Sequence, residues 1–156
     1  MTTQIGILAF NDMEELDAIG PWEVFSWAAK QENSGLAVCT IGSGSREITC
    51  AKVAPDCTWV TSVCTGALLL HRAGQLQGKR ATTYWAAVDL LRGGGNVEVM
   101  DDVRFVRDGN VVTSAGISAG MDMSLWLLGQ LKSPEFARFV QKGIEYFPAP
   151  PYTAAA

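Results

Sequence analysis

The sequence predicts an α/β fold built on a mostly parallel sheet, in one domain that spans residues 1–156. Residues 4–10 (QIGILAF) and 36–41 (LAVCTI) are short and almost continuously apolar, which is typical of strands covered on both faces. A helical pattern lies between them, and the order strand, helix, strand favours a right-handed parallel unit. At 156 residues the chain is long enough to bury a core of its own.

The first half of the chain supplies the elements of this unit in order. Gly20-Pro21 opens the first helix, because proline at the first turn loses no hydrogen bond. Residues 42–56 are polar and irregular, and residues 59–63 form the third strand. A helix over residues 65–73 follows this strand directly.

The second half continues with helices around one hairpin. A helix begins at residues 82–85 and runs to about residue 91, where three glycines stop it. Asp108-Gly109 joins strands at residues 103–107 and 110–114 as a two-residue hairpin. A helix over residues 118–131 precedes a last one that begins at Ser133-Pro134-Glu135, a capping pattern.

The composition excludes several classes of function. A net charge of −4 and a pI near 4.9 argue against a nucleic-acid partner, which would need a basic face. No apolar run approaches the roughly 20 residues that cross a bilayer, so no membrane partner is expected. Met1 leads straight into a strand without a charged leader, and the expected location is the cytoplasm.

The cysteine pattern predicts reduced thiols and no metal site. Cys39, Cys50, Cys57 and Cys64 are separated by spacings that match no zinc motif, and the chain has a single histidine. Cysteines in an intracellular chain are usually reduced. A metal is therefore not expected.

Cys64 is the main candidate for chemistry. A β-branched strand ends at this residue, a Thr65-Gly66 turn follows, and an apolar helix begins, which is the arrangement of a nucleophile elbow. A helix N-terminus beside the sulfur would lower the pKa of the thiol. The N–H groups of Thr65 and Gly66 are the expected oxyanion donors. A small buried cysteine in a βα turn, followed by an ordinary helical threonine, is the plain structural alternative.

The expected proton-transfer group is a carboxylate. His71 lies seven residues past Cys64 on the predicted helix, about 10 Å along its axis, and cannot reach the sulfur. Asp17 follows the first strand, and the carboxyl ends of parallel strands meet at one edge of a sheet, so Asp17 is the first candidate. A helix-capping role for Asp17 stays open. Glu23 is the second candidate, although a first-turn glutamate more often interacts with the helix dipole.

Five segments form a pattern that extends over nearly the whole chain: QIGILAF, LDAIGPWEVF, WVTSVCTGALLLHRAGQLQGKRATTYW, VRDGNVVTSAGISAGMD and GIEYFPAPPY. Together they resemble the ThiJ/PfpI superfamily, and within it the isonitrile hydratase branch. The resemblance implies a flavodoxin-like (class I glutamine amidotransferase-like) three-layer sandwich, a homodimer, and a small-molecule substrate. It further implies that an isonitrile is hydrated to an N-substituted formamide without a cofactor. Cys64 would be the nucleophile, Asp17 the acid and base, and Thr65 a supporting residue.

The chain departs from this superfamily in two places. Relatives often carry Thr-Thr-His-Trp where this chain has Tyr84 before Trp85, so a mechanism that needs that histidine is in doubt and Tyr84 is a secondary candidate. The second departure is a missing piece of roughly 35–40 residues after residue 52, about one βαβ crossover. Its loss should expose two strand edges or force them to pair, unless a partner chain supplies the strand.

Other functions remain open beside the hydratase. A glyoxalase- or deglycase-like activity is known from other branches of the superfamily. The same fold also precedes helix-turn-helix domains, so a ligand-sensing module is an alternative, although the sequence leaves no room for such a domain. The missing crossover makes a catalytically impaired remnant a further alternative. The sequence alone does not choose among these functions.

Overall fold

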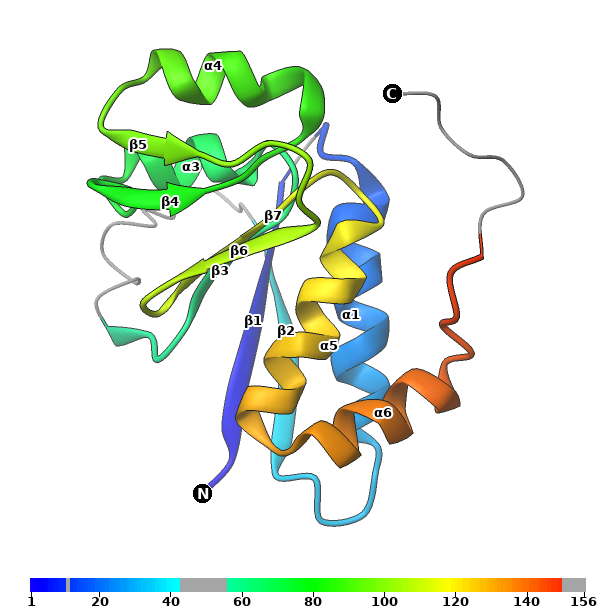
Figure 1. Ribbon diagram of the computed structural model, residues 1–156. Coiled ribbons are helices and arrows are strands. Elements are labelled where there is room, and N and C mark those ends of the chain that lie inside the picture. The colour runs from blue at the N-terminus through cyan, green and yellow to red at the C-terminus, as the bar shows by residue number, and fades with distance from the viewer. Residues whose placement is uncertain (11, 43–55, 150–156) are drawn as a thin grey trace.

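The structure is a computed structural model that describes residues 1–10, 12–42 and 56–149 (Figure 1). The expected irregular segment at residues 42–56 lies mostly outside these residues. In chain order the elements are β1 (Thr3–Ala9), α1 (Glu15–Ala29), β2 (Leu36–Gly42), β3 (Val60–Ser62), α3 (Gly66–Arg72), β4 (Lys79–Ala81), η2 (Trp85–Ala87), α4 (Val88–Gly93), β5 (Val97–Val99), β6 (Phe105–Asp108), β7 (Val111–Ser114), α5 (Ala119–Leu131) and α6 (Pro134–Gly143).

The strands are mostly parallel, as the sequence predicts. β1 pairs with β2 in parallel, from Thr3 opposite Leu36 to Ala9 opposite Gly42. β3 pairs in parallel with β7, and β6 pairs antiparallel with β7. β4 and β5 form a third parallel pair. The expected hairpin at Asp108-Gly109 is confirmed as the β6–β7 connection, with a positive φ of 63° at Gly109.

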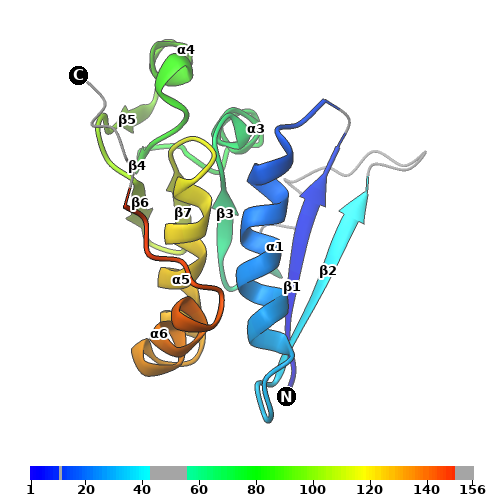
Figure 2. The same ribbon diagram turned by 90° about the vertical axis from the view of Figure 1, so that its right-hand side faces the viewer.

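The strands do not form one continuous ladder. Among the described residues, β1 is hydrogen-bonded to β2 and β3 to β7, but no ladder joins β1 to β3. The missing crossover was expected either to expose edges of β1 and β3 or to make these two strands pair. In this structure β1 and β3 do not pair with each other. β1 and β2 instead connect to the rest of the molecule through α1, which packs against α5 (Figure 2).

Two apolar cores lie on opposite faces of the strands, which makes the fold a three-layer α/β sandwich. One core joins α1, α5, α6 and β2. The other joins α3 and α4 to strands β3, β4 and β7. The fully buried members of the first core are Val24, Ala28, Leu128 and Val140, and those of the second are Ala67, Leu76, Ala81 and Leu91.

Two expectations about the elements were wrong. α1 begins at Glu15, not at Gly20-Pro21, so Pro21 lies within the helix, where it removes the one hydrogen bond to the Asp17 carbonyl. β4 and β5 were not anticipated, because three-residue strands are too short to show a periodic pattern. The last helix was anticipated correctly, and the Ser133 hydroxyl caps it by accepting a bond from the Phe136 N–H at 3.2 Å.

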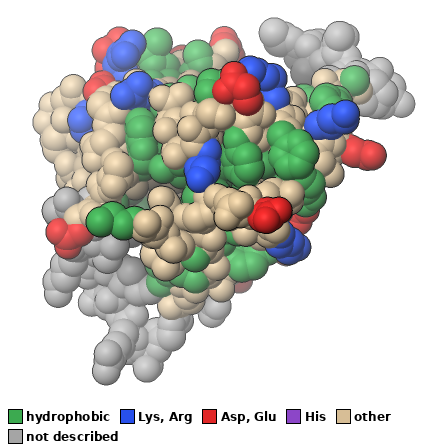
Figure 3. All heavy atoms as spheres, turned by 90° about the horizontal axis from the view of Figure 1, so that it is seen from below, with side chains coloured by type: hydrophobic (Ala, Val, Ile, Leu, Met, Phe, Trp, Pro, Cys, Tyr) green, Lys and Arg blue, Asp and Glu red, His purple; other side chains and the backbone are tan. Residues whose placement is uncertain are grey.

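The surface shows no concentration of positive charge on the face that Figure 3 presents. Lys and Arg side chains are scattered there among Asp and Glu side chains and apolar groups (Figure 3). Across the described residues, none of the helices combines the length and the apolar character that crossing a membrane requires.

Candidate active site

Cys64 occupies the sharp turn that the sequence predicts between a strand and a helix. β3 ends at Ser62 and α3 begins at Gly66, two residues on either side of the cysteine. Cys64 has a φ of +55°, which few residues with a side chain adopt, and it is buried with 7% of its surface exposed. A strained residue at a sharp turn between a strand and a helix is typical of a nucleophile elbow.

The main chain of Cys64 is fixed from two sides. The Cys64 N–H donates to the Ala115 carbonyl at 3.2 Å, which joins the turn to the segment that follows β7. The Cys64 carbonyl accepts a hydrogen bond from the Thr83 hydroxyl at 2.8 Å, and both groups are buried. These two bonds hold the strained conformation in place.

Replacing Thr83 by valine should destabilise the protein by about 0.5–1.5 kcal/mol, because the buried Cys64 carbonyl then loses its 2.8 Å donor at unchanged side-chain volume and keeps, among the described residues, only the Ala67 N–H at 3.4 Å. Urea unfolding measures the loss. The matched control is Thr61→Val, at an exposed position of β3 where valine suits a strand. If Thr83→Val unfolds at the same urea concentration as Thr61→Val, the hydroxyl does not stabilise the turn.

Asp17 lies in the first turn of α1 and reaches the same place. The Cys64 thiol donates a hydrogen bond to its carboxyl, and so does the Ile117 N–H. The Asp17 Oδ1 atom is buried and accepts no hydrogen bond from any described residue. The structure therefore brings together the two residues that the sequence named first, and it leaves one carboxyl oxygen available to a third group.

Burial sets the protonation of both groups. It raises the pKa of Asp17 above its usual value, against the smaller lowering effects of the Cys64 thiol and the Ile117 N–H. Burial also raises the pKa of Cys64, and the negative charge of Asp17 adds to this rise, while the Thr65 and Ile117 N–H groups oppose it. The expectation of a lowered thiol pKa was therefore wrong: the helix start contributes, but desolvation and Asp17 outweigh it.

The direction of the two pKa shifts determines which proton transfers Cys64 and Asp17 can carry out. A thiol whose pKa is raised needs a base in order to attack, and the Asp17 carboxyl is hydrogen-bonded to it. A carboxyl whose pKa is raised holds a proton more readily and can pass it on as an acid. The arrangement thus suits a nucleophile that is deprotonated only as it reacts.

The structure separates the roles expected of Thr65 and Gly66. The Thr65 N–H bonds to the Cys64 sulfur, whereas its exposed side chain caps nothing in α3. The Gly66 N–H donates to the Val63 carbonyl at 2.9 Å. Contrary to the sequence-based expectation, Gly66 is therefore not a free oxyanion donor, because the tight turn uses its N–H internally.

The secondary candidates lie outside the contact between Cys64 and Asp17. Glu23 is exposed in the middle of α1, so it is not a first-turn residue as expected. The ring of Tyr84 packs so closely on Gly116 that a Cβ added there would overlap it, which gives Tyr84 a packing role. His71 bonds through Nε2 to the Gly95 carbonyl at 2.8 Å. As predicted, it does not bond to the Cys64 sulfur.

Ile117 is a candidate site residue that sequence reasoning missed. Its N–H contacts both Cys64 and Asp17, and it has a φ of +54° in the turn between β7 and α5. Two signals could have found this turn. β3 and β7 are parallel, so they end at the same edge, and small residues (Ala115-Gly116) follow β7 directly.

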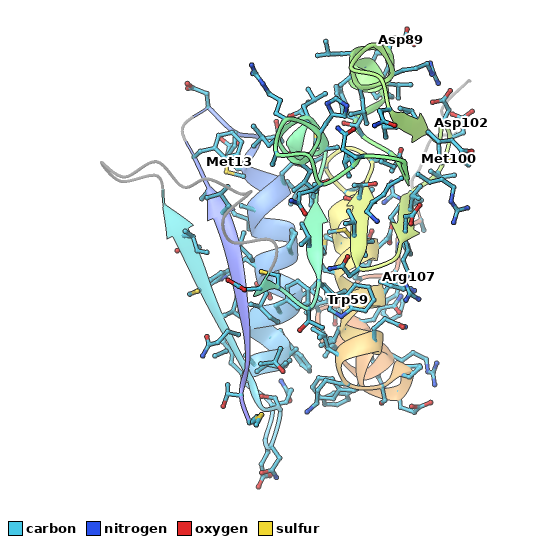
Figure 4. All side chains as sticks on the ribbon, turned by 90° about the vertical axis from the view of Figure 1, so that its left-hand side faces the viewer. Met13, Trp59, Asp89, Met100, Asp102 and Arg107 are labelled. Carbon is cyan, nitrogen blue, oxygen red and sulfur yellow. The ribbon has the colours of Figure 1, made fainter. Side chains whose placement is uncertain are left out.

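A cavity of about 370 Å³ flanks the main chain of this site. Thr83 and Ala115, which both bond to the Cys64 backbone, line its inner wall. Asp89 and Asp102 line its outer part, at the α4 end of the molecule (Figure 4). Figure 4 also shows Trp59 and Arg107 well away from these aspartates. Across the described residues, no group of three His, Cys, Asp or Glu side chains could hold a metal ion.

Comparison with known proteins identifies the family. The DJ-1/PfpI family profile matches residues 52–130, about half of the chain. The chain belongs to the DJ-1/PfpI family. The resemblance to the ThiJ/PfpI superfamily that the sequence motifs suggested is thereby confirmed, because both names describe this group.

Relatives of the DJ-1/PfpI family match the chain along its whole length. An isonitrile hydratase of Pseudomonas putida is 36% identical over 193 aligned positions, covering all of this chain and 84% of that protein. The alignment is 37 positions longer than the 156-residue chain, which agrees with the expected missing piece. A crystal structure of a ThiJ/PfpI protein from Pseudomonas syringae superposes with a TM-score of 0.78 at 26% identity, covering 100% of this chain and 80% of that one.

A third relative has the same fold at lower identity. The crystal structure of DJ-1beta from Drosophila melanogaster superposes with a TM-score of 0.77 at 20% identity. The superposition covers 95% of this chain and 100% of that one. The flavodoxin-like α/β sandwich implied by the sequence resemblance is therefore confirmed, whereas the residues that carry chemistry must be argued from the site.

Proposed function

We propose that this protein is a lyase that hydrates isonitriles to N-substituted formamides through a cysteine nucleophile. The observation that carries the proposal is the hydrogen bond between the buried Cys64 thiol and the Asp17 carboxyl at the elbow. The whole-chain similarity to an isonitrile hydratase supports the choice of substrate. The terminal isonitrile carbon carries a lone pair and has no leaving group, so it accepts a nucleophile only together with a proton, and this pair can supply both.

In the first half of the reaction, Cys64 adds to the isonitrile. A bond forms between Sγ and the terminal carbon while the thiol proton passes to the Asp17 carboxylate. Asp17 then delivers this proton to the same carbon, which gives a thioimidate (R–N=CH–S–Cys64). No group leaves, and the sum of the two steps is the addition of S–H across the isonitrile carbon. The Thr65 and Ile117 N–H groups stabilise negative charge on the sulfur during the attack.

In the second half, water releases the product. Asp17 accepts a proton from water as the water oxygen bonds to the thioimidate carbon, and Asp17 then delivers this proton to the nitrogen. The C–S bond then breaks while the hydroxyl proton returns to the sulfur. The products are a formamide (R–NH–CHO) and the free Cys64 thiol. The cycle consumes one water and uses only side chains of this chain, so no cofactor is part of the proposal.

Product analysis tests this proposal. The purified protein is incubated with cyclohexyl isocyanide or with methylglyoxal, before and after dialysis against EDTA, and the products are measured by mass spectrometry. We expect cyclohexylformamide, at a rate that EDTA does not change. Conversion of methylglyoxal without formamide would overturn the proposal in favour of a glyoxalase- or deglycase-like enzyme. If the folded protein converts neither substrate, it is a catalytically impaired relative or a sensing module.

A further inference from the structure

Three side chains that take no part in the proposed chemistry form a cluster behind the Ile117 turn. Arg104 donates from Nε to Oδ2 of Asp122 at 2.6 Å. The hydroxyl of Tyr146, in the segment after α6, donates to the other oxygen of Asp122 at 3.1 Å. The cluster therefore gathers the residue before β6, the first turn of α5 and the C-terminal segment into one hydrogen-bonded group.

The cluster holds both ends of the turn that reaches the active site. At one end, the Arg104 carbonyl accepts from the Ala115 N–H at 2.9 Å. At the other, both Nη atoms of Arg104 donate to the Ser118 hydroxyl at 3.2 Å. The hydroxyl of Tyr146 also lies 3.5 Å from the Ser118 carbonyl. The four-residue turn from Ala115 to Ser118 is thus fixed at its first and last residues.

The same turn contacts the two reacting groups. The Ala115 carbonyl accepts the Cys64 N–H at 3.2 Å, and the Ile117 N–H bonds to Cys64 and Asp17. Ile117 has a left-handed φ of +54°, which a β-branched residue adopts only when its surroundings impose it. The contacts at the ends of the turn help to impose it, together with the bond from the Gly120 N–H to the Ile117 carbonyl at 3.1 Å.

We propose that Arg104, Asp122 and Tyr146 are positioning residues that hold the Ala115–Ser118 turn in its strained conformation, so that the Ile117 N–H stays directed at Cys64 and Asp17. The inference extends the proposed function to the second layer of residues around the site and rests on that function. None of the three touches the reacting atoms, and each acts through the turn.

Loosening this turn should change the pKa of Cys64 in one direction. Within the described residues, the charged group that faces the Cys64 sulfur is Asp17 on α1, and the N–H donors are Thr65 on the elbow and Ile117 on the turn. The Ile117 N–H lowers the pKa of Cys64, so a loosened turn raises it and leaves less thiolate at a given pH. Cys64 should then react more slowly with an alkylating reagent, whether or not an isonitrile is present.

The test measures alkylation of Cys64 by iodoacetamide between pH 6 and 10, quantified on the Cys64 peptide by mass spectrometry. Tyr146→Phe removes the hydroxyl that contacts Asp122 and the Ser118 carbonyl, and Asp122→Asn removes the charge that pairs with Arg104, both at almost constant shape. We expect alkylation at pH 7.5 to slow about threefold, which is within the range for the loss of one ordinary hydrogen bond. For formamide production we expect kcat to fall while KM stays unchanged.

The matched control is Asp108→Asn. Asp108 pairs with Lys79 and Arg80 and is 31% exposed, close to the 26% of Asp122, but it lies at the β6–β7 hairpin. The Asp108→Asn substitution should lower the stability of the protein and leave the alkylation profile of Cys64 unchanged. The inference is overturned if folded Tyr146→Phe and Asp122→Asn alkylate as the wild type does, or if Asp108→Asn slows alkylation equally. Because alkylation needs no isonitrile, a failed hydratase assay would be recognised separately.

Discussion

Cys64→Ala should abolish formamide production, lowering turnover by at least about a thousandfold, because no other side chain can form the thioimidate. The protein should stay folded. Alanine removes only the sulfur from a residue whose backbone bonds, to Ala115 and Thr83, involve main-chain atoms of the cysteine. Turnover of cyclohexyl isocyanide and a circular dichroism melt measure the two effects.

Cys39→Ala is the matched control for this experiment, because Cys39 carries an exposed thiol on β2. We expect wild-type turnover from it. Full activity in Cys64→Ala would refute the covalent mechanism. Activity lost in both variants would show that the loss reflects damage to the fold.

Asp17→Asn should have opposite effects on two reactions of the same sulfur. Isonitrile turnover should fall by about 10²- to 10⁴-fold, since asparagine neither accepts nor delivers the proton. Alkylation of Cys64 by iodoacetamide should become faster at neutral pH, because the charge and hydrogen bond of Asp17 both raise the pKa of the thiol. The alkylation profile should therefore shift to lower pH.

The direction of the change in stability on Asp17→Asn can be predicted as well. Folding raises the pKa of Asp17, so the ionised carboxylate opposes folding at any pH above that raised value. Neutral asparagine removes this cost, and the melting temperature at pH 7 should not fall. Glu15→Gln, at an exposed position of the same helical turn, should change neither reaction. If alkylation of Asp17→Asn slowed instead, Asp17 would not be the group that keeps the thiol protonated.

The elbow could be predicted from the sequence because its signals are local. A β-branched strand, a cysteine, a small turn and an apolar run are adjacent in the chain, and the structure places β3, Cys64 and α3 accordingly. The meeting of Asp17 with Cys64 followed from one rule of parallel sheets, although the start of α1 was misplaced. Only the rule about strand ends was needed for that contact, not the exact helix boundary.

The chemistry of the sulfur could not be predicted in the same way. The sequence shows that a helix begins after Cys64, but it does not show how deeply the thiol is buried or that Asp17 bonds to it. The burial of the thiol and its bond to Asp17 reverse the expected direction of the shift in the Cys64 pKa. The Ile117 donor was missed for a related reason: a left-handed isoleucine has no local signature, because its conformation is imposed by distant contacts.

The separation of β1 from β3 has a mechanical consequence for the reacting pair. Asp17 belongs to the part of the chain built on β1 and β2, Cys64 to the part built on β3, and no described ladder joins the two. The spacing of acid and nucleophile is instead maintained by α1 on α5, where Gly20 lies so close to Met121 that an added Cβ would come within 3.1 Å of its Cγ. In the proposed mechanism, proton transfer therefore depends on the distance between α1 and α5. Warming that loosens this helix contact should separate Asp17 from Cys64 while the paired strands stay paired.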